Sequence, residues 1–254
     1  MSGRDVVTGF YVDVLGKLVG RGAISLEDSV LVTCGGPLDE RVMGLLGFRE
    51  VVITNIDDGM SNNYQDAENL TYGDKSFDVV VVHAGLHHCQ SPHRALLEMY
   101  RVARKCVVVF EARDSFLMRM AIRLGLTVDY ELEGISVDSR GGVADGSVPN
   151  YIYRWTERDV EKTVASYDPA HVSEISFFYE MRLPLQRFER TGRPLLKLIG
   201  SVLEPLSRLA TFLIPKQCNE FAFSIRKSDI LQPWMVTETK MSVEYAAERR
   251  RLYR

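Results

Sequence analysis

The chain has 254 residues, 46% of them hydrophobic and 26% charged, and these proportions exclude a wholly disordered, collagen-like or fibrous protein. Its formal net charge of -3 at pH 7 argues against nucleic acid as a partner, because phosphate binding needs a basic surface. The four cysteines are widely spaced and include no Cys-x-x-Cys pair, so we expect free thiols and a cytoplasmic location. We expect no signal peptide and no membrane span, because the sequence has no basic-then-apolar leader and no run of about 18 apolar residues.

The first half of the chain alternates between helical and strand-like patterns. Apolar residues at helical spacing predict an amphipathic helix over Val6–Val19. Runs rich in β-branched residues predict four buried strands, at Ser29–Thr33, Val51–Asp57, Val79–Val82 and Lys105–Phe110. Helices are expected between them at Asp39–Leu46 and Pro92–Ala103. This alternation is typical of a parallel sheet with helices on both faces, whose ligands bind beyond the carboxyl ends of the strands.

After Glu111 the alternation becomes irregular. Residues 112–165 combine short helical patterns with a polar, glycine-containing loop at 138–147, and a long loop within a domain is commonly a lid. Thr156 and Asp159 have the spacing of a capping box at the start of a helix. Strand-like runs return at Ile175–Tyr179 and Glu220–Ile225.

Six motifs follow one another between Val30 and Glu111. They are Val30–Gly36, Asn55–Asp57, Asp66–Leu70, Ser76–Val81, Gly85–His88 and Leu96–Val102. In order and spacing they resemble the class I S-adenosylmethionine-dependent methyltransferases. Within that family they resemble the group that has a Leu-His-His motif after the strand that the family numbers as its fourth. The resemblance implies an α/β, Rossmann-like, seven-stranded sheet that is mostly parallel, with helices on both faces, an antiparallel last strand and a helical insertion before it. It also implies a methyltransferase domain at 1–228, with a lid and acceptor region at 112–165 and the insertion at 180–218, followed by a tail at 229–254.

The resemblance implies S-adenosyl-L-methionine as the cofactor and S-adenosyl-L-homocysteine as its product. Gly35 and Gly36 would let the backbone approach the cofactor, since a Cβ there would collide with it. Asp57 would accept hydrogen bonds from the ribose hydroxyls, and Asp66 would accept from the adenine amino group. The full set of candidate cofactor residues is Cys34, Gly35, Gly36, Asp57, Asp66, Ala67, His83 and Ala84.

The glycine-rich motif departs from the family pattern at three positions. Val32 replaces a usual carboxylate, Leu38 replaces a third glycine, and Pro37 lacks the N–H that is usual there. Asp39 is a candidate to supply the missing carboxylate. The alternative is a methyltransferase-like subunit that has lost catalysis and stabilises a partner.

Histidines cluster where the acceptor is expected. Four of the five lie within eleven residues, at positions 83, 87, 88 and 93. A hydroxyl acceptor must lose a proton, and a histidine is largely neutral at pH 7 and suited to take it. His87 or His88 is therefore the candidate general base, and the alternative for either is to pack against the loop and hydrogen-bond it.

We assign no metal site from the sequence. The His-His-Cys run at residues 87–89 matches no zinc-ligand spacing and gives poor tetrahedral geometry. For a divalent cation held by carboxylates, the candidates by location alone are Asp114, Asp138 and Asp145.

An aromatic cluster follows the polar loop. Tyr151, Tyr153, Arg154 and Trp155 are candidates to line an acceptor pocket, because aromatic faces stack on sugars or rings. The alternative is a cluster that anchors the core.

Apolar residues form a stripe over residues 195–213, interrupted at Pro205. Three alternatives are open for it: packing on the sheet, a homodimer seam, or contact of residues 187–213 with a membrane surface or a lipid-linked substrate. Basic residues just upstream favour an anionic partner, and they are Arg187, Arg190, Arg193 and Lys197. The tail ends in a run of arginines and is expected to be an exposed basic helix.

Together these features predict a methyltransferase located in the cytoplasm or peripherally at the membrane. The expected reaction is O-methylation of a sugar, a glycan or a specialised metabolite, by in-line transfer to a hydroxyl. Carbon methylation of a quinone-like ring is the alternative reaction, and the non-catalytic partner subunit is the alternative class.

Overall fold

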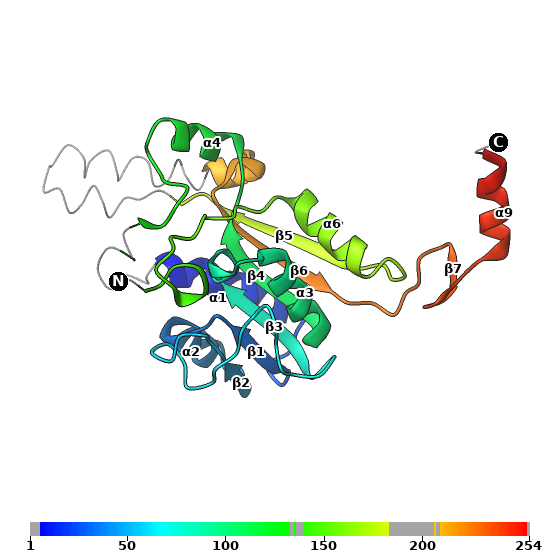
Figure 1. Cartoon of the computed structure of the whole chain (residues 1–254), viewed down its shortest axis with the longest axis horizontal. Helices are drawn as coiled ribbons and strands as arrows, with labels where there is room; N and C mark the ends of the chain where they lie inside the picture. The colour runs from blue at the N-terminus through cyan, green and yellow to red at the C-terminus, as the bar shows by residue number, and fades with distance from the viewer. Residues whose placement is uncertain (1–5, 133–134, 136–139, 183–205, 207–208, 253–254) are drawn as a thin grey trace, which may run out of the picture.

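Six strands form the central sheet of the computed structural model, which describes residues 6–132, 135, 140–182, 206 and 209–252. The strands are β1 (Ser29–Thr33), β2 (Glu50–Ile53), β3 (Phe77–His83), β4 (Ala103–Ala112), β5 (Glu174–Glu180) and β6 (Glu220–Arg226). Their order across the sheet is β2-β1-β3-β4-β6-β5, and β1 to β4 run parallel. β6 pairs antiparallel with both β4 and β5, so it is the reversed strand of this sheet (Figure 1).

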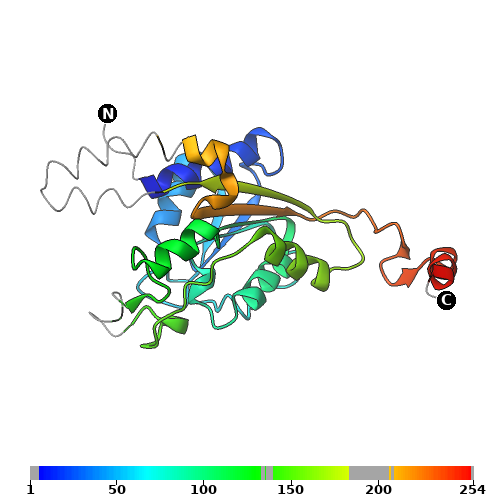
Figure 2. The ribbon, with the colours of Figure 1, turned by 90° about the horizontal axis from the view of Figure 1, so that it is seen from above.

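Helices cover both faces of the sheet (Figure 1; Figure 2). α1 (Val6–Gly20) and α2 (Pro37–Leu46) pack on one face, and α3 (Pro92–Val102) and α6 (Glu157–Tyr167) pack on the other. β3 serves both cores, because Val79 and Val81 point to the α1–α2 side and Val80 and Val82 to the α3–α6 side. All four valines are at most 1% exposed, as expected for a parallel strand that is buried on two faces.

Shorter elements connect and extend this frame. α4 (Phe116–Arg123) follows β4, and the 3₁₀ turns η1 (Leu86–His88), η2 (Val143–Asp145) and η3 (Pro215–Gln217) lie in loops. After β6 the chain forms the hairpin β7 (Met235–Thr237) and β8 (Lys240–Met241), then α9 (Val243–Leu252), and these extend away from the sheet (Figure 1; Figure 2). Within the described ranges, no helix combines the length and the apolar composition needed to cross a membrane.

The predicted fold class is confirmed, with a correction to the number of strands. Seven strands were expected, whereas the sheet has six in the part of the chain that the structure describes. No run was predicted for the seventh strand, and the long connection between β2 and β3 forms none, since its residues 57–63 read Asp-Asp-Gly-Met-Ser-Asn-Asn. Glycine, asparagine and aspartate favour turns over strands, so pairing there is reduced to an isolated bridge between Asn55 and Tyr64. For the same reason β2 ends at Ile53, earlier than the predicted end at Asp57.

Most of the apolar stripe predicted over residues 195–213 lies outside the described residues. The structure describes residue 206 and residues 209–213 of it. The side chains of Leu209 and Leu213 are 51% and 63% exposed. The role of the stripe therefore stays a prediction.

Candidate functional site

The loops that follow β1, β2 and β3 enclose a cavity of about 730 Å³ at the carboxyl edge of the sheet. This volume suits a drug-sized ligand or a nucleoside-containing cofactor. All eight candidate cofactor residues lie along its wall: Cys34, Gly35, Gly36, Asp57, Asp66, Ala67, His83 and Ala84. His88 also lines the cavity, while His87 lies behind it. The residues therefore converge, although they come from four separate stretches of sequence.

The turn after β1 needs glycine for packing within the protein, while the expected approach of its backbone to the cofactor stays a prediction. A Cβ on Gly35 would lie 2.8 Å from side-chain carbons of Val32 and Ile53, so the collision is with the protein's own strands. The backbone N–H of Gly35 also donates to the carbonyl of Thr54 at 2.9 Å. Gly35 thus lets β1 and the segment after β2 approach each other, which places the turn at the cavity.

Asp39 borders the cavity but is already engaged within the protein. One carboxylate oxygen accepts from the Tyr11 hydroxyl at 2.9 Å, and the other accepts from the Gly36 N–H at 2.9 Å. Burial raises the pKa of Tyr11 and the Asp39 carboxylate raises it further, while the Tyr11 ring stacks on His83 with centroids 4.7 Å apart. Asp39 therefore ties α1 to the start of α2, and its use as a replacement carboxylate for the cofactor stays a prediction.

Two aspartates present carboxylates to the cavity from the loops after β2. Asp57 accepts from the Gly59 N–H at 2.8 Å, and Asp66 accepts from the Glu68 N–H at 2.9 Å. In both cases it is the Oδ1 atom that accepts this bond, and such short-range turns hold each carboxylate in place. Arg140 approaches from the predicted lid, with its Nη2 atom 3.6 Å from Asp57 Oδ1.

The described part of the polar loop covers this cavity, with Gly141, Gly142, Ala144 and Asp145 in its wall. A Cβ on Gly142 would lie 2.0 Å from the carbonyl oxygen of Val148, so the loop folds tightly on itself. Its location agrees with a lid, and its movement stays a prediction.

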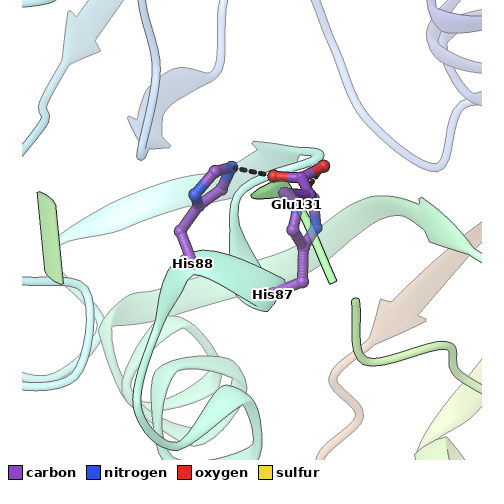
Figure 3. Close-up of side chains that lie close together, drawn as sticks. All are labelled: His87, His88 and Glu131. Atoms are coloured by element: carbon purple, nitrogen blue, oxygen red, sulfur yellow. Dashed lines mark ion pairs between the residues drawn. The ribbon is translucent and has the colours of Figure 1, made fainter. Parts of the chain in front are cut away.

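His87 and His88 have different surroundings (Figure 3). His87 is buried, and its Nδ1 lies 2.9 Å from Glu111 Oε2, while the other Glu111 oxygen accepts from the Leu86 N–H at 2.7 Å. Burial lowers the pKa of His87, but the charges of Glu111 and Glu131 outweigh it and raise the pKa to about 10. His88 faces the cavity, and burial together with the neighbouring His87 holds its pKa below the usual value. His87 therefore fits the expected alternative of holding the loop, and His88 is the neutral histidine at pH 7.

Glu131 connects the two histidines from the opposite side of the site (Figure 3). Its Oε1 lies 3.7 Å from His87 Nε2, and its Oε2 lies 3.8 Å from His88 Nε2. His87 holds the pKa of Glu131 at about 2, so this carboxylate is ionised throughout the neutral range.

The four candidate acceptor residues do not line the cavity. Trp155 is fully buried among core side chains that include Phe223, and the Tyr153 hydroxyl contacts His93 Nε2 at 3.2 Å. Arg154 is held by an ion pair with Asp129 at 2.9 Å, and Tyr151 is half exposed. These positions agree with the core-anchoring alternative for Trp155 in particular, since a buried indole cannot stack on an acceptor.

The carboxylates considered for a cation are also apart from the cavity or already paired. Asp114 pairs with Arg119 at 2.7 Å, and Asp145 pairs with Arg140. Asp138 lies outside the described residues.

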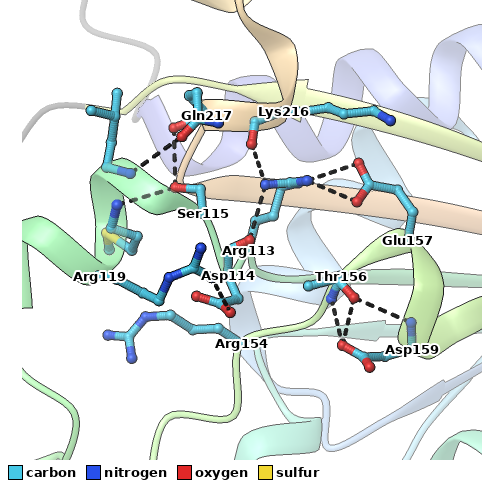
Figure 4. A network of polar contacts seen from close by, with 12 residues as sticks. Arg113, Asp114, Ser115, Arg119, Arg154, Thr156, Glu157, Asp159, Lys216 and Gln217 are labelled. Atoms are coloured by element: carbon cyan, nitrogen blue, oxygen red, sulfur yellow. Dashed lines mark hydrogen bonds and ion pairs between the residues drawn. The ribbon is translucent and has the colours of Figure 1, made fainter.

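Arg113, directly after β4, joins the elements beyond the cavity (Figure 4). Its guanidinium donates to both oxygens of Glu157, at 3.0 and 2.8 Å, and to the backbone carbonyls of Asp114 and Lys216. Ser115 caps α4 by accepting from the Met118 N–H at 3.1 Å. This network anchors α4, α6 and η3 to the end of one strand.

Glu111, Glu131 and Arg113 were not predicted from the sequence. Glu111 lies near the end of β4, so the rule that polar residues at strand ends form the site could have found it. No local pattern marks Glu131, because its relation to the histidines arises only from folding.

Comparisons with known proteins agree with this architecture. Residues 41–110 match the family model described as a methyltransferase domain. No curated protein matches the sequence. The YcgJ protein from Bacillus subtilis is 12% identical with a TM-score of 0.52, over 85% of this chain and 98% of that one.

Two further solved structures were crystallised with S-adenosylhomocysteine (SAH). The plantazolicin methyltransferase BpumL, in complex with a triazolic desmethylPZN analog and SAH, is 12% identical with a TM-score of 0.51, over 89% of this chain and 86% of that one. Magnesium protoporphyrin IX methyltransferase from Synechocystis PCC 6803 is 13% identical with a TM-score of 0.50, over 88% and 84%. At these identities the likeness concerns the fold.

Proposed function

We propose that this chain, a member of the class I S-adenosylmethionine-dependent methyltransferases, transfers the methyl group of that cofactor to a hydroxyl of a small molecule or glycan. The observation that carries the proposal is the convergence of eight separately predicted cofactor residues on one cavity. The methyltransferase-domain match over residues 41–110 supports it independently.

The cavity residues suit the parts of S-adenosylmethionine. Asp57 would accept from the ribose hydroxyls and Asp66 from the adenine amino group, with the Ala67 N–H available to the ring. His83 and Ala84 would lie beside the methionine portion. The geometry favours this assignment because both aspartates are pre-positioned by turn hydrogen bonds that use one oxygen and leave the other for the ligand.

His88 is our candidate for the general base. When bound, the cofactor supplies a methyl group on a sulfonium, which a nucleophilic oxygen can attack in line. His88 would accept the proton that the acceptor hydroxyl loses when its oxygen takes the methyl group from sulfur, and S-adenosylhomocysteine would be the other product. Its position in the cavity wall and its lowered pKa support this role, since the base must be unprotonated before attack. His87 is the positioning residue, held by Glu111.

Val32 and Leu38 depart from the family's glycine-rich motif and therefore favour a second candidate function, that of a methyltransferase-like subunit without catalysis. Cofactor binding discriminates the two. We would titrate the full chain with S-adenosylmethionine and SAH by isothermal calorimetry, beside Asp57→Ala and the matched control Asp58→Ala, whose wild-type side chain is 91% exposed.

Micromolar binding that Asp57→Ala weakens at least about tenfold and Asp58→Ala does not would support the proposal. Absence of binding in the wild type, with a normal melting transition, would overturn it and favour the non-catalytic subunit.

A screen of acceptor compounds with labelled cofactor is the second experiment. With the acceptor so found, His88→Asn should lower kcat by about 100-fold or more while the affinity for the cofactor stays unchanged.

A further inference from the structure

Three potential metal ligands converge beside the cavity. One atom each from His87, His88 and Glu131 lies within 4.8 Å of the others (Figure 3). The three residues come from η1 and from a segment more than forty positions later in the chain. Within the described residues this is the one group of three or more histidine, cysteine or acidic side chains that satisfies this spacing.

The spacing of these atoms is too long for hydrogen bonds. The two histidine-to-Glu131 separations are 3.7 and 3.8 Å, whereas a charged nitrogen–carboxylate bond measures about 2.8 Å. Ligands that share a tetrahedral zinc ion at bond lengths of about 2.0–2.1 Å lie about 3.3 Å apart. The observed separations are nearer to those of atoms around a common ion than to those of a direct donor and acceptor.

Further polar groups hold two of the ligands in place. The Nδ1 atom of His87 lies 2.9 Å from buried Glu111, so His87 donates there and points its Nε2 atom, whose proton a metal ion would displace, toward Glu131. Asn150, which is fully buried, donates to Glu131 Oε2 at 2.8 Å. A carboxylate behind a ligating histidine is the common second layer of protein metal sites, because it fixes the tautomer and the ring orientation.

We propose that His87, His88 and Glu131 form a binding site for a divalent transition-metal ion such as Zn²⁺, and that an ion bound there blocks methyl transfer. Two imidazoles and one carboxylate are a ligand set that zinc accepts, whereas magnesium and calcium prefer sites made of oxygen ligands alone. The ion takes the place of the Nε2 proton of His87. The negative charges of Glu111 and Glu131 balance its positive charge.

The blocking effect follows from the chemistry of imidazole and rests on the proposed function. A neutral imidazole has a single basic lone pair, and a metal ion at His88 Nε2 uses it. His88 then cannot accept the proton of an acceptor hydroxyl. Metal binding and general-base catalysis by His88 therefore exclude each other.

The test is a titration of chelator-treated, dialysed full-length protein with Zn²⁺ by isothermal calorimetry at neutral pH. We expect one equivalent to bind with a Kd in the micromolar range or tighter, and His88→Asn and Glu131→Gln to weaken binding by about tenfold or more. His171→Asn is the matched control, because His171 also lies between two carboxylates, at 2.8 Å from Asp168 and 3.7 Å from Glu238, without a second histidine. It should leave the Kd within about twofold.

Substitution of Co²⁺ for Zn²⁺ gives a second readout, since the visible absorption of Co²⁺ reports its coordination. A d–d band that appears in the wild type and is lost in Glu131→Gln supports the site even if calorimetric signals are small. Glu131 is 40% exposed at its side chain, so this variant should fold, and a melting curve checks it. No Zn²⁺ binding by the wild type, or equal binding by both ligand variants, would overturn the site.

Calorimetry with S-adenosylmethionine on the same samples separates this inference from the proposed function. Protein that binds the cofactor but not Zn²⁺ contradicts the metal site alone. Protein that binds Zn²⁺ but not the cofactor contradicts the proposed function and the blocking role that depends on it. With the acceptor in hand, stoichiometric Zn²⁺ should lower the initial rate at least about tenfold and chelator should restore it. A rate that rises with Zn²⁺ overturns the blocking role.

Discussion

The cavity wall at the carboxyl ends of β1, β2 and β3, predicted to be the cofactor side, and the region beyond the histidines outside that wall, predicted to be the acceptor side, are constructed differently. On the cofactor side, the residues lie in the loops after β1 and β2 or at the end of β3, and short-range turns hold both aspartates, as in the Asp57–Gly59 contact. Beyond the histidines, side chains distant in sequence hold one another, as in the Arg113–Glu157 pair, 44 positions apart, and the His87–Glu111 pair, 24 apart. The cofactor side is thus determined largely by backbone geometry, and the acceptor side by individual side-chain contacts.

This difference implies that single side-chain substitutions should damage the acceptor side more than the cofactor side. On the cofactor side a lost side chain removes a contact with the ligand and leaves the strand ends in place. On the acceptor side it removes a contact that joins elements distant in sequence. The following substitutions test that contrast.

The largest effect is expected from Trp155→Ala. The indole is fully buried against Phe223 and His93, so its removal leaves a large cavity and should cost about 4 kcal/mol of unfolding free energy. Tyr151→Ala, at a half-exposed position, should cost less than about 0.5 kcal/mol. Urea denaturation of both variants measures this, and equal stabilities would restore Trp155 as an acceptor contact.

Arg113→Met should destabilise the chain by about 3 kcal/mol, because it leaves Glu157 with only the Tyr179 hydroxyl as a partner and removes the donor to two backbone carbonyls. The matched control is Arg119→Met, which breaks an ion pair with Asp114 at a side chain that is 53% exposed. There we expect less than about 1 kcal/mol. If both variants lose the same stability, the Arg113 network does not hold the acceptor side together.

The pair of Arg113 and Glu157 should also make the free energy of unfolding depend on pH. Burial raises the pKa of Glu157, but Tyr179 and Arg113 outweigh burial and hold the pKa below its usual value. Because the folded pKa lies below the unfolded value of about 4.3, the stabilisation is present at neutral pH and is lost as the pH falls through the folded pKa.

The melting temperature of the wild type should therefore fall more steeply below about pH 5 than that of Glu157→Gln. Glu161→Gln is the control, since Glu161 forms an exposed pair with Arg158 at 3.4 Å. Parallel curves for the wild type and Glu157→Gln would contradict the assignment.

The smallest effect is expected on the cofactor side, from Arg140→Ala. Arg140 lies 3.6 Å from Asp57 Oδ1, the oxygen that already accepts from the Gly59 N–H, so its charge competes with the ligand for the Asp57 carboxylate, and its side chain is 59% exposed. Removing it should strengthen S-adenosylmethionine binding by about two- to fivefold, which is the scale of an exposed ion pair. Calorimetry measures this against Arg158→Ala, and a weaker affinity in Arg140→Ala would mean that the arginine holds the ligand instead.

Local patterns predicted most of the strands that carry the cofactor side, whereas its individual residues were implied by the family resemblance. The β-branched runs locate β1, β3 and β4 to within two residues, because a parallel strand buried on both faces requires such residues. The capping box of Thr156 and Asp159 appears as predicted, with Thr156 accepting from the Asp159 N–H at 3.2 Å. The errors lie where the resemblance was extended past the local sequence, as in the seventh strand, which residues 57–63 do not support.

The sequence by itself determined the alternation of helices and strands and the end of β3 near His83, because these depend on neighbours along the chain. Only the tertiary structure decided that His87 pairs with Glu111, that Glu131 reaches both histidines and that Trp155 is buried. Those outcomes depend on which distant side chains share one small volume after packing. A buried charge is stable only where the fold provides hydrogen-bond or ionic partners, and a buried indole only where it provides packing neighbours. The pattern of neighbouring residues in the sequence does not show which distant residues these will be.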